Sequence, residues 1–223
     1  MNVHVQPRPR SRQMILERVR AATHSVTKGA GELEDAYAAL PRGYVRSGGL
    51  SGEARIALMI ERLREYGAEV IECGPEQVQA AIAAQLASSG KHTFVVPAGL
   101  SAAWLTPGFE WKIDRDLIAS EIEQAEGVVT AAFCGVADSG TIVLHHSAAE
   151  ARRVLTLLPD WHLCVLRARQ VVETLPEYFA RCEQAPGLAT YISGPSATAD
   201  IEMTRIKGVH GPRLLHVVMV RDE

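Results

Sequence analysis

A stretch near the C-terminus, residues 191–212, combines glycine, hydroxylic and acidic residues in an order that suits anion binding. An apolar segment runs into Gly194 and Pro195. Three residues that favour the N-terminus of a helix follow, namely Ser196, Thr198 and Asp200. A helix N-terminus binds carboxylate or phosphate through its unpaired N–H groups and its partial positive charge. The stretch therefore predicts an anion-binding strand-to-helix junction, with plain helix capping as the alternative.

Two further glycines, Gly208 and Gly211, bracket His210 just before the last apolar run of the chain. Glycines at such places let the backbone turn tightly. A histidine held in a turn can donate a hydrogen bond to an anion, or exchange a proton near neutral pH. His210 is therefore a candidate catalytic residue, and a hydrogen bond from its ring to the backbone is the competing interpretation.

A third polar turn, ADSGT, spans residues 137–141. Its members are Asp138, Ser139, Gly140 and Thr141. Oxygens and backbone N–H groups in such a turn can form a nest for an anion, and the carboxylate of Asp138 is a candidate catalytic group. An ordinary turn residue is the alternative for Asp138. His145 and His146 follow, but neighbours on a strand point to opposite faces, so we do not expect them to bind one metal together.

Few other residues suggest chemistry. Arg152 and Arg153 can clamp an anion, although arginines before an apolar run more often form a solvated edge. The patterns G-x-G-x-x-G, G-x-x-x-x-G-K-[ST] and G-x-S-x-G are absent, so the usual nucleotide and serine-hydrolase anchors are missing. The cysteines form no C-x-x-C pair, which favours buried thiols. We expect this chain to bind no metal and no cofactor.

Alternating helices and apolar strands from residue 50 onward predict the framework that positions these turns. A helix is expected after Ser51, followed by strand 68–73, helix 75–90 and strand 92–98 as one βαβ unit. Further strands are expected at 141–146, 162–168, 189–193 and 214–220, with a short helix at 198–205. Residues 128–141 fit both a helical stripe and a strand, and we favour a helix. The pattern predicts an α/β fold with a mainly parallel, doubly wound sheet flanked by helices.

Composition limits the class of protein. The 223 residues are 47% hydrophobic with a net charge of -3, which is typical of one globular domain and does not favour nucleic acid as a partner. No apolar run approaches the roughly 20 residues of a membrane-spanning helix, and the N-terminus lacks the apolar core of a signal peptide. We expect a cytoplasmic protein. Residues 1–47 are expected to form a tail and a helical arm, and residues 48–223 the domain.

Three segments in this order resemble LUD-domain proteins of the LutC (YkgG) type: ADSGT, RRVLTLLPDWHLCVL and GPSATADIEMTRIKGVHGP. The resemblance covers roughly Gly48 to Val220. It implies a fold similar to the NagB/RpiA/CoA-transferase group, with ligands at glycine-rich turns beyond the carboxyl ends of strands. The family's more usual second motif is A-E-T-G-T; here Asp138 replaces the glutamate, which shortens the reach of the carboxylate.

The resemblance implies a component of a system that oxidises L-lactate to pyruvate beside iron–sulfur partners of the LutA/LutB type. In that role the chain would carry no redox chemistry itself. It would bind a small 2-hydroxy or 2-oxo acid, or a phosphate-like anion, near Gly194 to Asp200 and His210. Two alternatives stay open. One is a stand-alone enzyme of the CoA-transferase or sugar-phosphate type that uses Asp138 or His210, and the other is a regulatory module that senses a small carboxylate.

Overall fold

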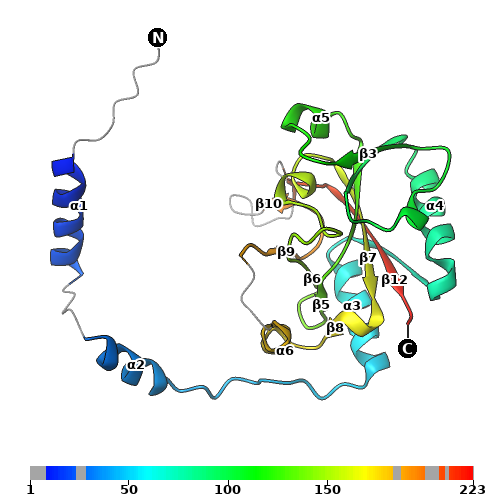
Figure 1. Ribbon diagram of the computed structural model, residues 1–223. Coiled ribbons are helices and arrows are strands. Elements are labelled where there is room, and N and C mark those ends of the chain that lie inside the picture. Colours follow the sequence, from blue (N-terminus) through cyan, green and yellow to red (C-terminus); the bar gives the residue numbers. More distant parts are fainter. Residues whose placement is uncertain (1–8, 24–28, 183–186, 199–205, 209–210, 223) are drawn as a thin grey trace, which may run out of the picture. The chain divides into compact units, whose positions relative to one another are not determined.

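The computed structural model describes residues 9–23, 29–182, 187–198, 206–208 and 211–222 (Figure 1). The chain divides into two compact units, Met1–Tyr44 and Val45–Glu223. The first unit contains two helices, α1 (Pro9–Ala22) and α2 (Ala30–Ala38). Both helices lie within residues 1–47, which we expected to form a tail and a helical arm.

Six parallel strands form the main sheet of the second unit, in the order β1-β12-β7-β4-β2-β3 (Figure 1). The strands are β1 (Glu69–Cys73), β2 (Thr93–Pro97), β3 (Glu110–Asp114), β4 (Gly127–Ala131), β7 (Trp161–Arg167) and β12 (Leu214–Val220). Their residues are mostly buried, as expected for strands that are covered on both faces. The predicted α/β fold with a mainly parallel sheet is confirmed.

Helices cover both faces of this sheet. Helix α4 (Val78–Ser88) packs on one face, where Val78, Ile82 and Leu86 contact a buried apolar cluster. Helices α3 (Gly52–Glu65) and α5 (Ala119–Glu123) pack on the opposite face. The predicted start of α3 is confirmed, since the hydroxyl of Ser51 accepts a hydrogen bond from the N–H of Ala54 at 3.3 Å.

A smaller sheet covers the same face as α3 (Figure 1). It has the order β8-β5-β6-β9, with strands β5 (Cys134–Val136), β6 (Thr141–Leu144), β8 (Val171–Val172) and β9 (Thr190–Ile192). β5 and β9 pair antiparallel with β6, and β8 runs parallel to β5. Residues 141–146 and 189–193 therefore contain strands, as predicted, but both strands belong to this sheet and not to the parallel one. Helix α6 (Leu175–Arg181) follows β8.

The helix that we favoured for residues 128–141 is wrong. The segment contains the end of β4 and all of β5, joined by a short turn. Val128, Val129 and Thr130 are all buried, and β4 is paired on both sides, to β2 and β7. Burial on both faces removes the alternation that marks a strand, and the apolar spacing then imitates a helical stripe.

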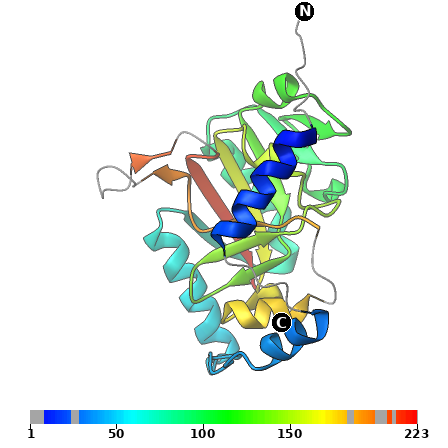
Figure 2. The ribbon, with the colours of Figure 1, turned by 90° about the vertical axis from the view of Figure 1, so that its left-hand side faces the viewer.

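The short helix expected at 198–205 falls mostly outside the described residues. Thr198 itself ends strand β10 (Ala197–Thr198), which pairs antiparallel with β11 (Ile206–Lys207) as a two-stranded ribbon. Thr198 is therefore the last residue of a strand, and the helix that it was expected to cap lies outside the described residues. Figure 2 shows this ribbon projecting beside the main sheet. Within the described ranges, no helix is long and apolar enough to cross a membrane.

Candidate functional site

A cavity of about 190 Å³ lies beside the amino ends of β7 and β12, on the face of the sheet that carries the smaller sheet. Its walls come from the 3-10 helix Arg153–Thr156, the starts of β7 and β12, and the chain that leaves β9. The lining residues are Arg153, Thr156, Leu157, His162, Tyr191, Ile192, Ser193, Gly194, Ser196, Ala197, Pro212 and Leu215. The turn at Gly194 follows the carboxyl end of β9, as the resemblance implies for a ligand-binding turn, but β9 belongs to the smaller sheet. The cavity lies at the amino ends of the parallel strands β7 and β12.

Three hydroxyl groups link the ADSGT turn to this cavity. The hydroxyls of Ser139 and Thr141 lie 2.7 Å apart, and those of Thr141 and Ser193 lie 2.8 Å apart. The antiparallel pairing of β6 with β9 holds these residues side by side. Ser193 also lines the cavity. The two motifs, more than fifty residues apart in sequence, are therefore joined through side chains.

Two glycines of these motifs pack closely against the end of α3. Gly140 has φ +58°, and a Cβ placed there would lie 2.7 Å from the Cβ of Arg62. Gly194 has φ +88°, and a Cβ there would lie 2.5 Å from the Cβ of Tyr66. Glycine is the residue that combines a left-handed backbone with such a close approach. Both glycines thus hold their turns against α3, and Gly194 lines the cavity as well.

The chain around Ser196 is held by backbone hydrogen bonds. The N–H of Ser196 donates to the carbonyl of Pro212, and the N–H of Gly208 donates to the carbonyl of Ser196, both at 2.8 Å. Gly208 and Gly211 line a neighbouring hollow with Leu157, Leu158, Asp160 and Arg213. Ser196, Gly208 and Gly211 are therefore brought close together, as the motif suggested. Asp200 and His210 lie outside the described residues, so the anion-binding role of Asp200 and the catalytic role of His210 stay predictions.

Asp138 lies away from the cavity. It is exposed on the turn between β5 and β6, and its backbone N–H donates to the carbonyl of Glu173 at 3.0 Å. Asp138 and Ser139 do not line the cavity. Pro195 is half-buried and lies in sequence between Gly194 and Ser196, which do line it. The structure therefore does not bring the candidate carboxylate to this cavity.

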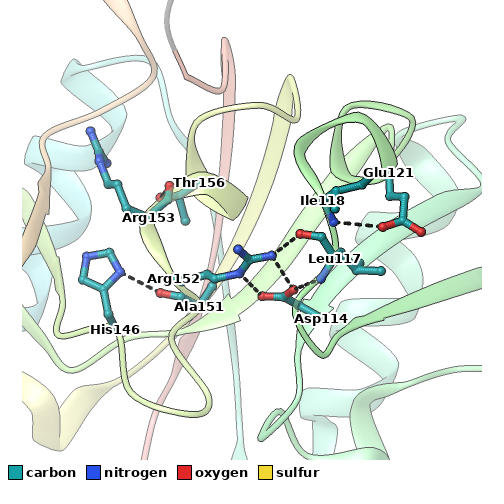
Figure 3. Close-up of polar contacts among 9 residues, drawn as sticks. All are labelled: Asp114, Leu117, Ile118, Glu121, His146, Ala151, Arg152, Arg153 and Thr156. Carbon is teal, nitrogen blue, oxygen red and sulfur yellow. Dashed lines mark hydrogen bonds and ion pairs between the residues drawn. The ribbon is translucent and has the colours of Figure 1, made fainter. Parts of the chain in front are cut away.

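The two neighbouring arginines have different surroundings (Figure 3). Arg152 forms a two-pronged ion pair with Asp114 at 2.7 and 2.8 Å, and it also donates to the carbonyl of Leu117. This pair lowers the pKa of the Asp114 carboxyl. Arg153 extends the opposite way, toward the cavity, and no carboxylate pairs with it within the described part of the chain. The guanidinium of Arg152 is thus occupied by partners within the protein, whereas that of Arg153 can bind an anion in the cavity.

A short hydrogen-bonded chain positions Arg153. The guanidinium donates to the hydroxyl of Thr190 at 3.4 Å, and that hydroxyl lies 2.9 Å from the Nε2 of His146. The Nδ1 of His146 in turn lies 2.8 Å from the carbonyl of Ala151 (Figure 3). A carbonyl only accepts, so Nδ1 is the protonated nitrogen. His146 therefore ties the loop before Arg153 to strand β9.

His145 and His146 lie beyond the end of β6, so they are not on a strand as expected, and their rings have different partners. The ring of His145 stacks on Phe133 with 3.7 Å between centroids, and its Nε2 lies 2.8 Å from the hydroxyl of Tyr178. Burial lowers the pKa of His145. Across the described residues, no group of three or more histidine, cysteine or acidic side chains is arranged to hold a metal ion.

His162 is a cavity residue that the sequence did not reveal. It is fully buried at the start of β7, and its Nε2 lies 2.8 Å from the hydroxyl of Thr130. Burial lowers the pKa of His162 to about 4, so the ring is neutral at pH 7. The available signal was a polar residue inside an otherwise apolar predicted strand, which usually has a buried partner or a function.

Together these groups suit a small organic anion. Arg153 supplies a cation at one side, and Ser193 and Ser196 supply hydroxyls, whereas the hydroxyl of Thr156 donates to the carbonyl of Arg153 at 3.1 Å. Leu157, Ile192 and Leu215 add an apolar wall, as expected of ligand sites in which a few polar groups set the orientation. A charged guanidinium and hydroxyl donors bind a carboxylate through charge-assisted hydrogen bonds.

Known proteins resemble this chain, and a family model matches the region that contains the cavity. A model of the LUD domain matches residues 56–220. Lactate utilization protein C of Deinococcus radiodurans is 38% identical over 164 residues, which are 72% of this chain and 76% of that protein. The Escherichia coli protein described as uncharacterized protein YkgG is 40% identical over 110 residues, 46% of this chain and 47% of that protein. Lactate utilization protein C of Bacillus subtilis is 33% identical over 125 residues, 52% of each chain.

A solved structure agrees with these matches. The crystal structure of a DUF162 family protein from Deinococcus radiodurans superposes with a TM-score of 0.64 and 31% identity, and it covers 77% of this chain and 99% of that one. The matches therefore span about three quarters of the Deinococcus protein and about half of the Escherichia coli and Bacillus proteins. Because the domain model matches well over half of the residues, the chain belongs to the LUD domain family.

Proposed function

We propose that this chain has a role in lactate utilization, as a component without redox chemistry of a system that oxidises L-lactate to pyruvate. Its cavity would bind the small carboxylate, a 2-hydroxy or 2-oxo acid. The names of the Deinococcus and Bacillus relatives support the role in lactate utilization. The observation that carries the binding role is Arg153, a guanidinium that faces the cavity while its neighbour Arg152 is paired with Asp114.

Partner proteins would transfer the electrons in this proposal. Oxidation of lactate to pyruvate removes a pair of electrons and two protons from the substrate, and iron–sulfur clusters on LutA/LutB-type partners would accept the electrons one at a time. This chain would then position the acid, or hold the partners together around it. Its own residues at the cavity can bind and orient a carboxylate, which is the part of the reaction that they suit.

The role can be tested by reconstitution. The purified chain is combined with the iron–sulfur partner proteins, and L-lactate-dependent reduction of an electron acceptor is measured with and without it. We expect electron transfer to require this chain, and to fall about tenfold or more with Arg153→Gln, because one charge-assisted contact to the carboxylate is lost. Arg169→Gln is the matched control, since Arg169 is exposed, pairs with Asp222 and does not line the cavity. Unchanged electron transfer when the chain is omitted would refute the role.

The alternative of a stand-alone CoA-transferase-type enzyme gains no support from the position of Asp138. That carboxylate is exposed on the turn between β5 and β6, whereas Arg153 and Ser196 line the cavity. A panel of acyl-CoA and phosphosugar substrates, given to the isolated chain, would separate the two functions. We expect no turnover that depends on Asp138.

A further inference from the structure

A row of three buried polar side chains runs from the cavity into the sheet. His162 and Cys164 lie two residues apart on β7 and so share one face, and Thr130 lies beside them on the neighbouring strand β4. The Nε2 of His162 is 2.8 Å from the hydroxyl oxygen of Thr130, and that hydroxyl donates to the sulfur of Cys164 at 3.7 Å. All three residues are fully buried. The row therefore connects a cavity wall to the interior.

The protonation states of these three groups determine which atom donates and which accepts in each hydrogen bond. Burial raises the pKa of the Cys164 thiol to about 12, so at neutral pH it is an uncharged thiol whose sulfur can accept a hydrogen bond. A threonine hydroxyl has a single proton, and we assign that proton to the 3.7 Å contact with the sulfur, in which the hydroxyl is the donor. The oxygen of Thr130 must then accept from the ring, which requires the proton of the neutral imidazole to be on Nε2. Nδ1 of His162 is left with a lone pair.

Nδ1 is the part of the ring that a ligand can reach. His162 lines the cavity, and the hydrogen bond of its ring among the described residues is the one to Thr130. Because Nε2 faces Thr130, Nδ1 is the ring nitrogen that remains for a ligand in the cavity, which Arg153 also lines.

We propose that His162, with its tautomer set by Thr130 and Cys164, makes the cavity select a 2-hydroxy acid over the corresponding 2-oxo acid. This inference rests on the proposed carboxylate-binding function. Arg153 would bind the carboxylate of either acid. The hydroxyl of a 2-hydroxy acid donates its proton to Nδ1, whereas the carbonyl oxygen of a 2-oxo acid is an acceptor that faces another acceptor. His162 determines specificity, and Thr130 and Cys164 are positioning residues.

The tautomer can be measured without any ligand. In the full-length chain labelled with ¹⁵N-histidine, the shifts of the ring nitrogens and their couplings to ring protons show which nitrogen carries the proton. We expect Nε2 of His162 to be protonated and Nδ1 to be bare at pH 7. A protonated Nδ1, which would arise if the thiol donated to Thr130 and Thr130 donated to the ring, would overturn the inference whatever the cavity binds.

Calorimetric titration of the same chain with L-lactate and with pyruvate tests the selectivity. We expect L-lactate to bind about tenfold more tightly, because one hydrogen bond is replaced by an acceptor–acceptor contact. Thr130→Val should bring the two dissociation constants close together, since it frees the tautomer, and Thr106→Val should keep the preference. Thr106 is a buried threonine outside the cavity, which makes it a matched control.

The outcomes separate this inference from the proposed function. Binding of both acids without a preference for L-lactate would overturn the selectivity, and a preference that survives Thr130→Val would overturn its assignment to the tautomer that Thr130 sets. Either result leaves carboxylate binding intact. Failure of the chain to bind either acid, alone and with its partners, would overturn the proposed function, and the selectivity with it.

Discussion

Arg152 and Arg153 are neighbours in the chain, yet their side chains have opposite roles in the structure. The sequence indicates a pair of cations before an apolar run, and nothing in that pattern distinguishes one from the other. The distinction comes from Asp114, which lies at the end of β3 and pairs with Arg152. Because the partner is far away in sequence, only the fold shows that Arg153 is the arginine that faces the cavity.

The buried ring of His162 makes the free energy of unfolding depend on pH. Its folded-state pKa is about 4, against 6.5 for an exposed histidine, so the unfolded chain binds more protons between these values. Stability is therefore full above pH 6.5 and is lost as the pH falls toward 4. The loss from this one group reaches about 3 kcal/mol, since each pKa unit corresponds to about 1.4 kcal/mol.

Urea unfolding measured at several pH values between 6.5 and 4 tests this prediction. His162→Gln should lower stability at pH 7, because the bond to Thr130 changes, but its stability should fall less steeply with acid than that of the parent chain. Burial also lowers the pKa of His216, so some slope should remain in the variant. Equal slopes for the two proteins would contradict the assignment.

At the scale of elements, the end of α3 organises the two motif turns. Ser51 and the buried face of Ile56, Met59, Ile60 and Leu63 define this helix in the sequence, and the structure confirms it. The sequence does not show that the turns containing Gly140 and Gly194 pack on the same helix end. Strand pairing in the smaller sheet creates that arrangement, and pairing between distant strands leaves no local signal.

Gly194→Ala should destabilise the protein more than Gly67→Ala. Both glycines have nearly the same left-handed backbone, φ +88° and φ +86°. A Cβ at position 67 meets open space, so the backbone cost of about 1 to 2 kcal/mol applies alone. A Cβ at position 194 also overlaps Tyr66 and must displace the turn or the helix end.

Thermal and chemical unfolding of the two variants, compared with the parent chain, measures this difference. The account expects an additional loss of at least about 1 kcal/mol for Gly194→Ala, in the range of overpacked core positions. It also expects weaker carboxylate binding in that variant only. Equal destabilisation by the two substitutions would show that the contact between Gly194 and α3 does not constrain the turn.

At the scale of the whole molecule, the fold class could be predicted from the alternation of strands and helices, whereas the site was predicted in part. Gly194 and Ser196, which the sequence singled out because a strand followed by small and hydroxylic residues is a local pattern, line the cavity, and their binding of an anion stays a prediction. His162 and Tyr191 were missed, since each is one polar or aromatic residue in a predicted strand. The cavity itself depends on how the smaller sheet lies over the parallel one.

The central claim is that Arg153 makes this cavity a binding site for a small carboxylate, within the region that matches the LUD domain. Calorimetric titration of the full-length chain with L-lactate, for the parent protein, Arg153→Gln and Arg169→Gln, tests it most directly. The account predicts saturable binding by the parent and by Arg169→Gln, and affinity reduced about tenfold or more in Arg153→Gln, as expected for loss of a charge-assisted contact. Equal affinity of all three proteins for L-lactate would contradict it.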